Sequence, residues 1–181
     1  MRRNLFLVLM PLAAYFFFTE NASACAYSFV GSCSSDIGLR INGTPAVFSV
    51  ADCPSGTAFQ GTYLGAIQSM SISYAFAITW ESCQNNVTGV TLCYRLTQEG
   101  GDPGEWRFYP LKQDSVKEES PYTTRYRSGD SDADLTNGLA ADKNYVLEIY
   151  FRADIDTIGD DFVPETVLIQ NNGGRNYAMS F

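Results

Sequence analysis

The amino-acid sequence predicts an all-β protein, and three observations lead to that prediction. Tyr145, Leu147, Ile149 and Phe151 occupy alternate positions, which is the period of a strand that buries one face more deeply than the other. Tyrosine and phenylalanine are abundant, with 11 and 12 copies in 181 residues, and aromatic residues favour strands. Turns rich in glycine, asparagine and serine recur between the strand patterns, whereas helix-favouring segments are hard to find.

The first 24 residues have the three parts of a secretory signal. A basic start precedes an apolar run over residues 5–18, and small residues lead up to Ala24. The apolar run is shorter than the about 20 residues that a membrane span requires. We therefore expect cleavage after Ala24, with residues 1–24 as signal peptide, and a protein that is secreted or held at the cell surface.

The five cysteines can be oxidised in an exported chain. Pairing cysteines that are near in sequence joins Cys33 to Cys53 and Cys83 to Cys93, and each bridge then closes a short β segment. Cys25 is left without a partner in this scheme. The small residues before Cys25 resemble a bacterial lipoprotein signal, in which that thiol is acylated. The segment departs from that pattern at Ala22 and at the polar residues 19–21. We expect plain cleavage, with lipidation of Cys25, and hence a membrane partner, as the alternative.

The strand patterns can be followed along the whole chain. Residues 26–30, 37–41 and 46–50 form short patterns, with an Asn42-Gly43 turn between the last two. Because this part is too small to be a domain, residues 25–65 are predicted to be an extension packed on a sandwich formed by residues 66–181.

The main patterns follow residue 65. Residues 70–80 show the cleanest alternation, and the face expected to be buried consists of Met70, Ile72, Tyr74, Phe76, Ile78 and Trp80. Residues 90–96 and 106–111 come next, and residues 122–127 are expected at a sheet edge because Pro121 and the arginines discourage pairing. Residues 163–169 and 177–181 form either a hairpin or one interrupted strand.

Two of these segments resemble a known family. Leu139 lies six residues before Tyr145, as in the tyrosine corner of fibronectin type III and immunoglobulin-like sandwiches, where the phenol bonds to upstream backbone. Trp80 and the pattern around Tyr94 are similar to strands B and C of the fibronectin type III fold. The resemblance covers residues 70–181 and implies an antiparallel sandwich of a kind found in bacterial secreted surface proteins, here with extra N-terminal strands. It says little about the ligand.

The composition excludes several function classes. The chain contains no histidine, which removes Ser-His-Asp and Cys-His catalysis and most catalytic zinc sites. No short spacing singles out a pair of carboxylates for glycoside hydrolysis, so we expect a protein that is not an enzyme. The net charge of −8 disfavours nucleic acid as a partner.

The sharpest candidate site is an acidic segment with oxygen ligands around a glycine turn, formed by Asp154, Asp156, Asp160 and Asp161. Calcium takes six to eight oxygen ligands, which a curled loop can present. The segment departs from the EF-hand pattern at Ile158, and solvated acidic loops are the alternative. A fibronectin-type order would place the second acidic run, residues 130–134, at the same end of the sandwich.

The sequence therefore predicts an adhesion or interaction module that displays residues 81–88, 112–120 and 154–165 to a protein or glycan at the cell surface. A carbohydrate-binding module is an alternative, for which the exposed platform would come from Trp106, Tyr109, Tyr122 and Tyr126. A surface-fibre subunit that accepts a neighbour's strand is another alternative.

Overall fold

The computed structural model describes residues 26–29, 35–50, 57–83, 86–117, 122–129, 132–156 and 166–181. These residues form strands and no helix, which confirms the all-β prediction for this part of the chain, and none of them belongs to a helix that could cross a membrane. The strands are β1 (Tyr27–Phe29), β2 (Ser35–Ile41), β3 (Thr44–Ser49), β4 (Thr57–Ala58), β5 (Met70–Glu81), β6 (Val87–Gln98), β7 (Arg107–Lys117), β8 (Tyr122–Arg127), β9 (Ala133–Asp134), β10 (Tyr145–Ile155), β11 (Thr166–Gln170) and β12 (Tyr177–Ser180).

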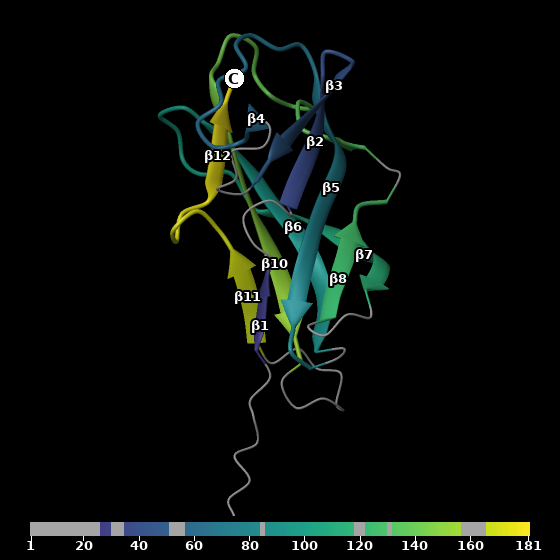
Figure 1. Cartoon of the computed structure of the whole chain (residues 1–181). Helices are drawn as coiled ribbons and strands as arrows, with labels where there is room; N and C mark the ends of the chain where they lie inside the picture. The colour runs from purple at the N-terminus through teal and green to yellow at the C-terminus, as the bar shows by residue number, and fades with distance from the viewer. Residues whose placement is uncertain are drawn as a thin grey trace, which may run out of the picture.

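The strands form one mixed sheet that curls into a half-barrel (Figure 1). Its hydrogen-bonded order is β11-β10-β6-β7-β8-β5-β2-β3-β4, while β1 and β9 pair with β5 and β12 pairs with β10. Strand β7 joins the two arms of the sheet: residues 107–111 pair with β6, and residues 112–117 pair with β8 across a bulge between Gln113 and Ser115. A bulge bends a strand and increases its twist, so this irregularity helps the sheet to curl.

Strand β10 lies in the centre of one arm. Its alternate side chains Tyr145, Leu147, Ile149 and Phe151 are all at most 7% exposed, which confirms the predicted buried face. Strands β11 and β12 both pair with β10, at residues 151–155 and 146–149 respectively. They are therefore one interrupted strand and not a hairpin, which settles the alternative that the sequence left open.

Strand β5 corrects a prediction about burial. Met70 and Ile72 face the core as expected, but Ala75 and Ala77 are fully buried and Trp80 is only partly buried. The pairing with β2 shifts register between Gly38, opposite Tyr74, and Leu39, opposite Ile72. One extra residue in β5 exchanges the two faces of everything that follows it. The prediction that Tyr74, Phe76, Ile78 and Trp80 lie in the core is therefore wrong.

The predicted edge strand at residues 122–127 is also placed differently. Strand β8 has β5 on one side and β7 on the other, so it is an interior strand. One of its arginines, Arg127, forms an ion pair with Asp114 of β7 at 3.4 Å. Arg127 therefore contacts the neighbouring strand β7 and does not keep a neighbour away.

The N-terminal strands belong to the same sheet as the rest. Strand β2 pairs with β5 over residues 35–41, and β3 returns beside β2 through the Asn42-Gly43 turn. Both turn residues have positive φ, 49° and 81°, as the predicted two-residue hairpin requires. The Asn42 side-chain oxygen accepts hydrogen bonds from the backbone of Gln68 and Ser69, which fixes the hairpin against the segment that enters β5. The domain boundary at residue 65 stays a prediction.

Candidate functional site: a pocket at the tyrosine corner

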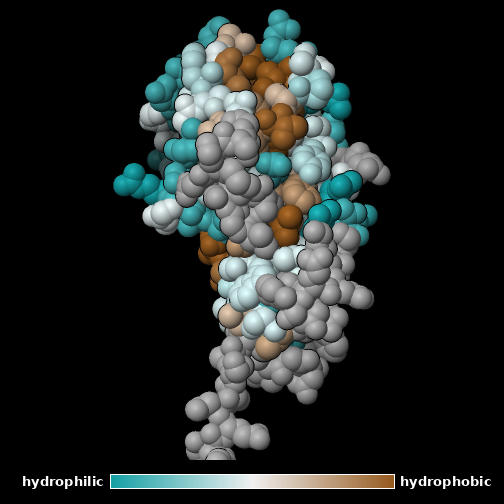
Figure 2. Space-filling model, in the orientation of Figure 1, coloured by the Kyte–Doolittle hydropathy of each residue, from teal (hydrophilic) through white to brown (hydrophobic). Residues whose placement is uncertain are grey.

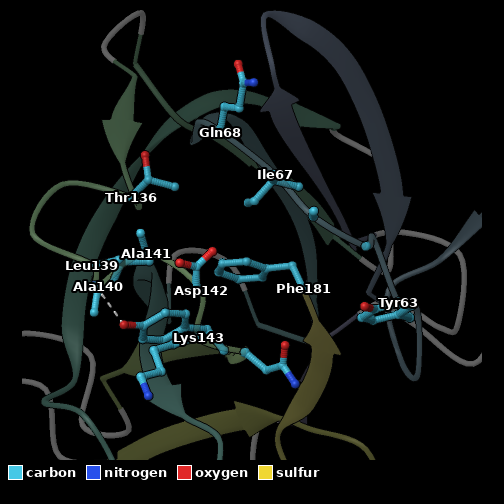
Figure 3. A pocket seen from close by; sticks show the side chains of 14 residues that line it. Tyr63, Ile67, Gln68, Thr136, Leu139, Ala140, Ala141, Asp142, Lys143 and Phe181 are labelled. Carbon is cyan, nitrogen blue, oxygen red and sulfur yellow. Dashed lines mark hydrogen bonds between the residues drawn. The ribbon is translucent and has the colours of Figure 1, made fainter.

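A pocket of about 620 Å³ opens near the C-terminal end of β12, where Phe181 lines it. Figure 2 shows hydrophobic side chains gathered at this end of the molecule. We call the cavity the corner pocket, and Figure 3 shows how its lining side chains converge. The lining residues come from the link before β5, the loop before β10 and the chain end: Tyr63, Gly65, Ala66, Ile67, Gln68, Thr136, residues 139–145 and Phe181.

Backbone hydrogen bonds hold these three segments together. The N–H groups of Gly61 and Leu64 donate to carbonyl oxygens of β12, and Ser180 donates in return to Thr62. Tyr145 and Phe181 exchange a pair of backbone hydrogen bonds of 2.9 and 3.0 Å. The pocket walls are therefore tied to β10 and β12, whose inward side chains lie in the core, and a site supported in this way is largely preformed.

Tyr145 forms the inner wall of the pocket. The backbone N–H of Ala140 donates a 2.9 Å hydrogen bond to the Tyr145 hydroxyl, so the phenol bonds to backbone that lies upstream of it in the chain. The Tyr145 ring stacks on Phe181 with centroids 5.9 Å apart, and Leu139 packs against the core beside them. The corner thus shapes the loop that supplies half of the pocket lining.

Tyr145→Phe should lower the free energy of unfolding by about 1 kcal/mol, the usual net value of one hydrogen bond. The ring and its stacking on Phe181 remain, so the change isolates the bond to Ala140. Urea denaturation of both proteins measures the difference. Tyr63→Phe is the matched control, because that ring is 69% exposed and we expect no measurable change. Equal stability of Tyr145→Phe and the native protein would contradict the structural role of the bond.

The pocket combines an apolar floor with a polar rim. Ile67, Leu139 and Phe181 contribute apolar surface, while Asp142 and Lys143 are the charged residues of the lining. The Tyr63 ring stands at the rim with 69% of its surface exposed. Aromatic and apolar surface in a concave site, with a few polar groups around it, suits binding. The corner pocket can therefore bind a ligand through shape complementarity, hydrophobic contact and hydrogen bonds.

Sequence reasoning missed Tyr63, because its surroundings carry no strand pattern. Gly61 and Gly65 flank it, both with positive φ (76° and 73°), and this conformation favours glycine. The two glycines on either side of Tyr63 are the sequence signal for a loop with a defined backbone conformation, and this signal could have identified Tyr63 as an exposed residue of that loop.

The predicted calcium ligands are only partly described. Asp154 lies near Arg152, with 3.5 Å between carboxylate and guanidinium. Asp156 is 4% exposed, and its backbone exchanges hydrogen bonds with Asn86, while Asp160 and Asp161 lie outside the described residues. Within the described ranges, no group of three or more acidic, cysteine or histidine side chains could hold a metal. The calcium site stays a prediction.

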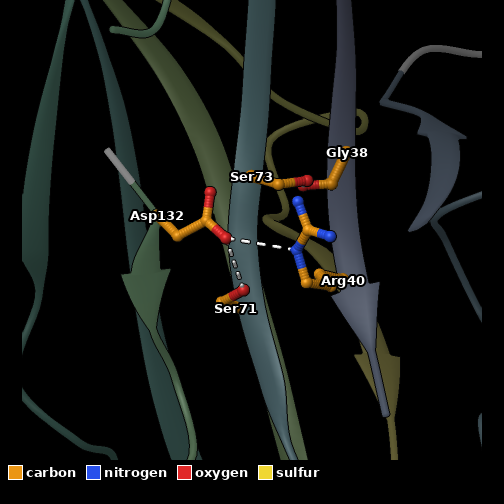
Figure 4. A network of polar contacts seen from close by, with 5 residues as sticks. All are labelled: Gly38, Arg40, Ser71, Ser73 and Asp132. Carbon is orange, nitrogen blue, oxygen red and sulfur yellow. Dashed lines mark hydrogen bonds and ion pairs between the residues drawn. The ribbon is translucent and has the colours of Figure 1, made fainter. Parts of the chain in front are cut away.

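Two carboxylates of the second acidic run, Asp132 and Asp134, make protein contacts, while Asp130 lies outside the described residues. Asp132 forms an ion pair with Arg40 at 3.3 Å and accepts a hydrogen bond from Ser71, as Figure 4 shows. Asp134 accepts hydrogen bonds from the backbone and hydroxyl of Thr136, which lower the pKa of Asp134. These carboxylates hold the segment that precedes the corner pocket.

The two acidic runs do not lie at the same end of the molecule, so that expectation is wrong. Asp134 pairs with Ser71 at the start of β5, whereas Asp154 pairs with Gly89, just beyond the turn that follows the end of β5. The reason is that β8 pairs with the second half of β5, residues 76–81, whereas β9 pairs with its start, at Ser71 and Ile72.

The predicted bridge between Cys83 and Cys93 is also wrong. Cys93 is a free cysteine with no exposed surface, and burial raises the pKa of its thiol. It lies well inside β6, between Phe108 of β7 and Tyr150 of β10, whereas Cys83 follows β5 in the other arm. Cys83 is disulfide-bonded. Cys25, Cys33 and Cys53 lie outside the described residues, so the Cys33–Cys53 bridge stays a prediction.

The predicted aromatic platform is not assembled as a row. Tyr126 is 3% exposed, and its hydroxyl donates to the Val87 carbonyl at 3.1 Å. Trp106 is partly buried, edge-on to Tyr150 at 4.9 Å and beneath the Arg95 guanidinium at 4.6 Å. Tyr109 packs against the core, and the side chain of Tyr122 is outside the described part of the structure.

The chain matches no protein-family model, no curated protein and no solved structure. Its function is therefore argued from the geometry of the molecule.

Proposed function

We propose that the protein is a non-enzymatic, exported adhesion module that recognises a partner protein at the cell surface. The observation that carries the proposal is the corner pocket, with its apolar floor and the exposed Tyr63 at its rim. An aromatic or aliphatic side chain of the partner would enter the pocket. Buried anchors of this type, next to a tyrosine, supply most of the energy in many protein interfaces.

The fold assignment that goes with this proposal is a fibronectin type III-like or immunoglobulin-like sandwich. Strand pairing supports it, because β2, β5 and β8 are neighbours in one arm, and β12, β10, β6 and β7 are neighbours in the other. In this interpretation β5, β6 and β10 are strands B, C and F of the family. The corner bond between Tyr145 and Ala140 is a second point of support.

The chemistry of the pocket supports binding in preference to catalysis. Asp142 is the only carboxylate side chain among the described lining residues, and the chain has no histidine. Hydrolysis of a glycosidic bond uses two facing carboxylates, and the lining supplies one. We therefore assign the pocket to recognition, with export through the N-terminal signal and calcium as a stabiliser of residues 154–161 as further parts of the proposal.

Carbohydrate is the second candidate ligand, and Tyr63 is the observation that favours it. Sugar faces stack on exposed aromatic rings, and the polar side chains of Gln68, Thr136 and Asn144 in the lining could bond hydroxyl groups. The protein partner is preferred because Ile67, Leu139 and Phe181 give the floor more apolar surface than hydroxyl-rich sugars need.

The test uses the purified mature chain as bait for a phage-displayed random peptide library. We expect selected peptides to share an aromatic or aliphatic anchor, and Tyr63→Ser to weaken their binding at least about tenfold, as loss of an interface anchor does. Phe108→Ser is the matched control, since Phe108 is an equally large ring that is 57% exposed outside the pocket. It should leave affinity within about twofold.

A glycan array on the same three proteins separates the two candidates. Glycan binding that depends on Tyr63, without peptide selection, would replace the protein partner by a sugar. Equal effects of Tyr63→Ser and Phe108→Ser, or no ligand in either screen, would contradict the assignment of the pocket.

A further inference from the structure

Strand β1 runs antiparallel to the last three residues of β5, and the register of this pairing is defined residue by residue. Tyr27 lies opposite Glu81, and Phe29 lies opposite Thr79. The pairing continues one step beyond both strands, because the N–H of Ser82 donates to the Ala26 carbonyl at 2.9 Å. The Ser82 hydroxyl completes this pair by accepting a 2.7 Å hydrogen bond from the Ala26 N–H.

Cys25 lies outside the described residues, but this register, continued by one residue, would bring Cys25 opposite Cys83. Directly opposed residues in an antiparallel ladder alternate between hydrogen-bonded and non-hydrogen-bonded pairs. Since Ala26 and Ser82 are hydrogen-bonded, a pair that followed them would be of the non-hydrogen-bonded type, in which the Cα atoms are about 4.5 Å apart. That separation lies inside the range of about 4.4–6.8 Å that a disulfide spans.

Cys83 is disulfide-bonded, and Cys93 is free. The partner of Cys83 is therefore Cys25, Cys33 or Cys53. We infer that it is Cys25, and that the bridge fastens the beginning of the mature chain to the end of β5.

Chain reach disfavours the other two partners. Ser35 pairs with Ala77, which is six residues, or about 20 Å along an extended strand, from Cys83. Cys33 is two residues from Ser35, a reach of about 7 Å. Cys53 is three residues beyond Val50, whose N–H donates to the Ser35 carbonyl, so its reach from the same point is about 10 Å. Even with the about 6 Å that a disulfide adds between Cα atoms, an extended chain from Ser35 to either cysteine would be too short to reach Cys83.

The bridge changes what Cys25 can do. When the disulfide forms, each thiol loses one proton and one electron, and the two sulfur atoms are joined. The two electrons pass by thiol–disulfide exchange to the disulfide of a thiol oxidoreductase in the export compartment, which is reduced to a dithiol. A sulfur in a disulfide cannot also carry a lipid thioether. Cys25 is then neither spare nor acylated, which corrects the pairing expected from sequence proximity and excludes the lipid alternative.

Non-reducing digestion of the exported protein with chymotrypsin tests the bridge by mass spectrometry. Cleavage after Tyr27 and Phe29 separates Cys25 from Cys33, and cleavage after Trp80 and Leu92 separates Cys83 from Cys53 and Cys93. We expect a peptide ending at Tyr27 to be joined to a peptide that begins after Trp80, and the two to separate on reduction.

Single substitutions give a second readout. Cys83→Ser should make Cys25 reactive with iodoacetamide without prior reduction, and Cys25→Ser should do the same for Cys83. Cys93→Ser is the control, since it should release no other thiol. A peptide that joins Cys83 to Cys33 or Cys53, or a lipid mass on Cys25, would overturn the inference. Because this experiment does not involve the corner pocket, its outcome is independent of the proposed function.

Discussion

Glu81→Ala should lower the free energy of unfolding by about 3 kcal/mol, although the residue lies at the end of a strand. The Glu81 carboxylate is only 3% exposed. One of its oxygens accepts hydrogen bonds from the backbone N–H groups of Asn86 and Val87, at 2.8 and 2.9 Å. Alanine would leave two buried donors without their acceptor, and hydrogen bonds to a charged group are worth about 1.5–3 kcal/mol each.

Urea denaturation of Glu81→Ala, Glu81→Gln and Glu105→Ala checks this result. Glutamine keeps an acceptor oxygen but loses the charge, so we expect an intermediate loss of about 1 kcal/mol. Glu105 is exposed, and its substitution should change stability by less than about 0.5 kcal/mol. If Glu81→Ala were as stable as Glu105→Ala, the buried carboxylate would not be needed to organise the start of β6.

Gly104→Ala is expected to cost about 2–3 kcal/mol, through overpacking against rigid backbone. A Cβ atom at position 104 would overlap the carbonyl oxygen of Leu96 in β6. Backbone cannot rotate away as a side chain can, so either the loop before β7 or the strand itself must shift. The free energy of unfolding, measured in urea, reports the cost.

Gly89→Ala is the matched control for this substitution. Gly89 lies in β6, the same strand as Leu96, and a Cβ atom there would have no neighbour within 4 Å. It should be neutral or slightly stabilising, because alanine restricts the unfolded chain more than glycine does. A neutral Gly104→Ala would show that the loop has room to move away from Leu96.

Much of the fold could be predicted because periodicity identifies a strand wherever one face is buried along its whole length. Strand β10 shows this: its alternate side chains from Tyr145 to Phe151 are all buried. The same holds for Val90, Leu92 and Tyr94 of β6. Periodicity carries no information about where an extra residue enters a strand. The bulge opposite Gly38 therefore reversed the expected burial from Tyr74 onward.

Glycine could have indicated that irregularity, but only with the partner strand in view. A Cβ atom at Gly38 would approach the Tyr74 Cβ to 2.8 Å, so a residue without a side chain is needed where the register shifts. A single sequence does not say which strand lies opposite. The same limit explains the error with Cys93, whose distance from Cys83 depends on the sheet arm to which each strand belongs.

The corner pocket could not be predicted as a unit, because its walls are far apart in the sequence. Tyr63, Thr136 and Phe181 meet only after β10 has paired with β12 and the preceding link has bonded to Ser180. The bond between the Tyr145 hydroxyl and upstream backbone could be predicted, since the spacing of Leu139 and Tyr145 is local. Local patterns thus located one wall of the pocket, and long-range pairing determined the others.

Strand β7 has a mechanical consequence for the whole molecule. The first half of β7 pairs with β6 and the second half pairs with β8. This strand of eleven residues therefore belongs to both arms of the sheet. If one arm unfolds, β7 loses its pairing on that side, and the other arm is destabilised as well. Thermal or chemical denaturation should therefore be a single cooperative transition. In the adhesion role proposed above, a force applied through a bound partner would act on both arms of the sheet together.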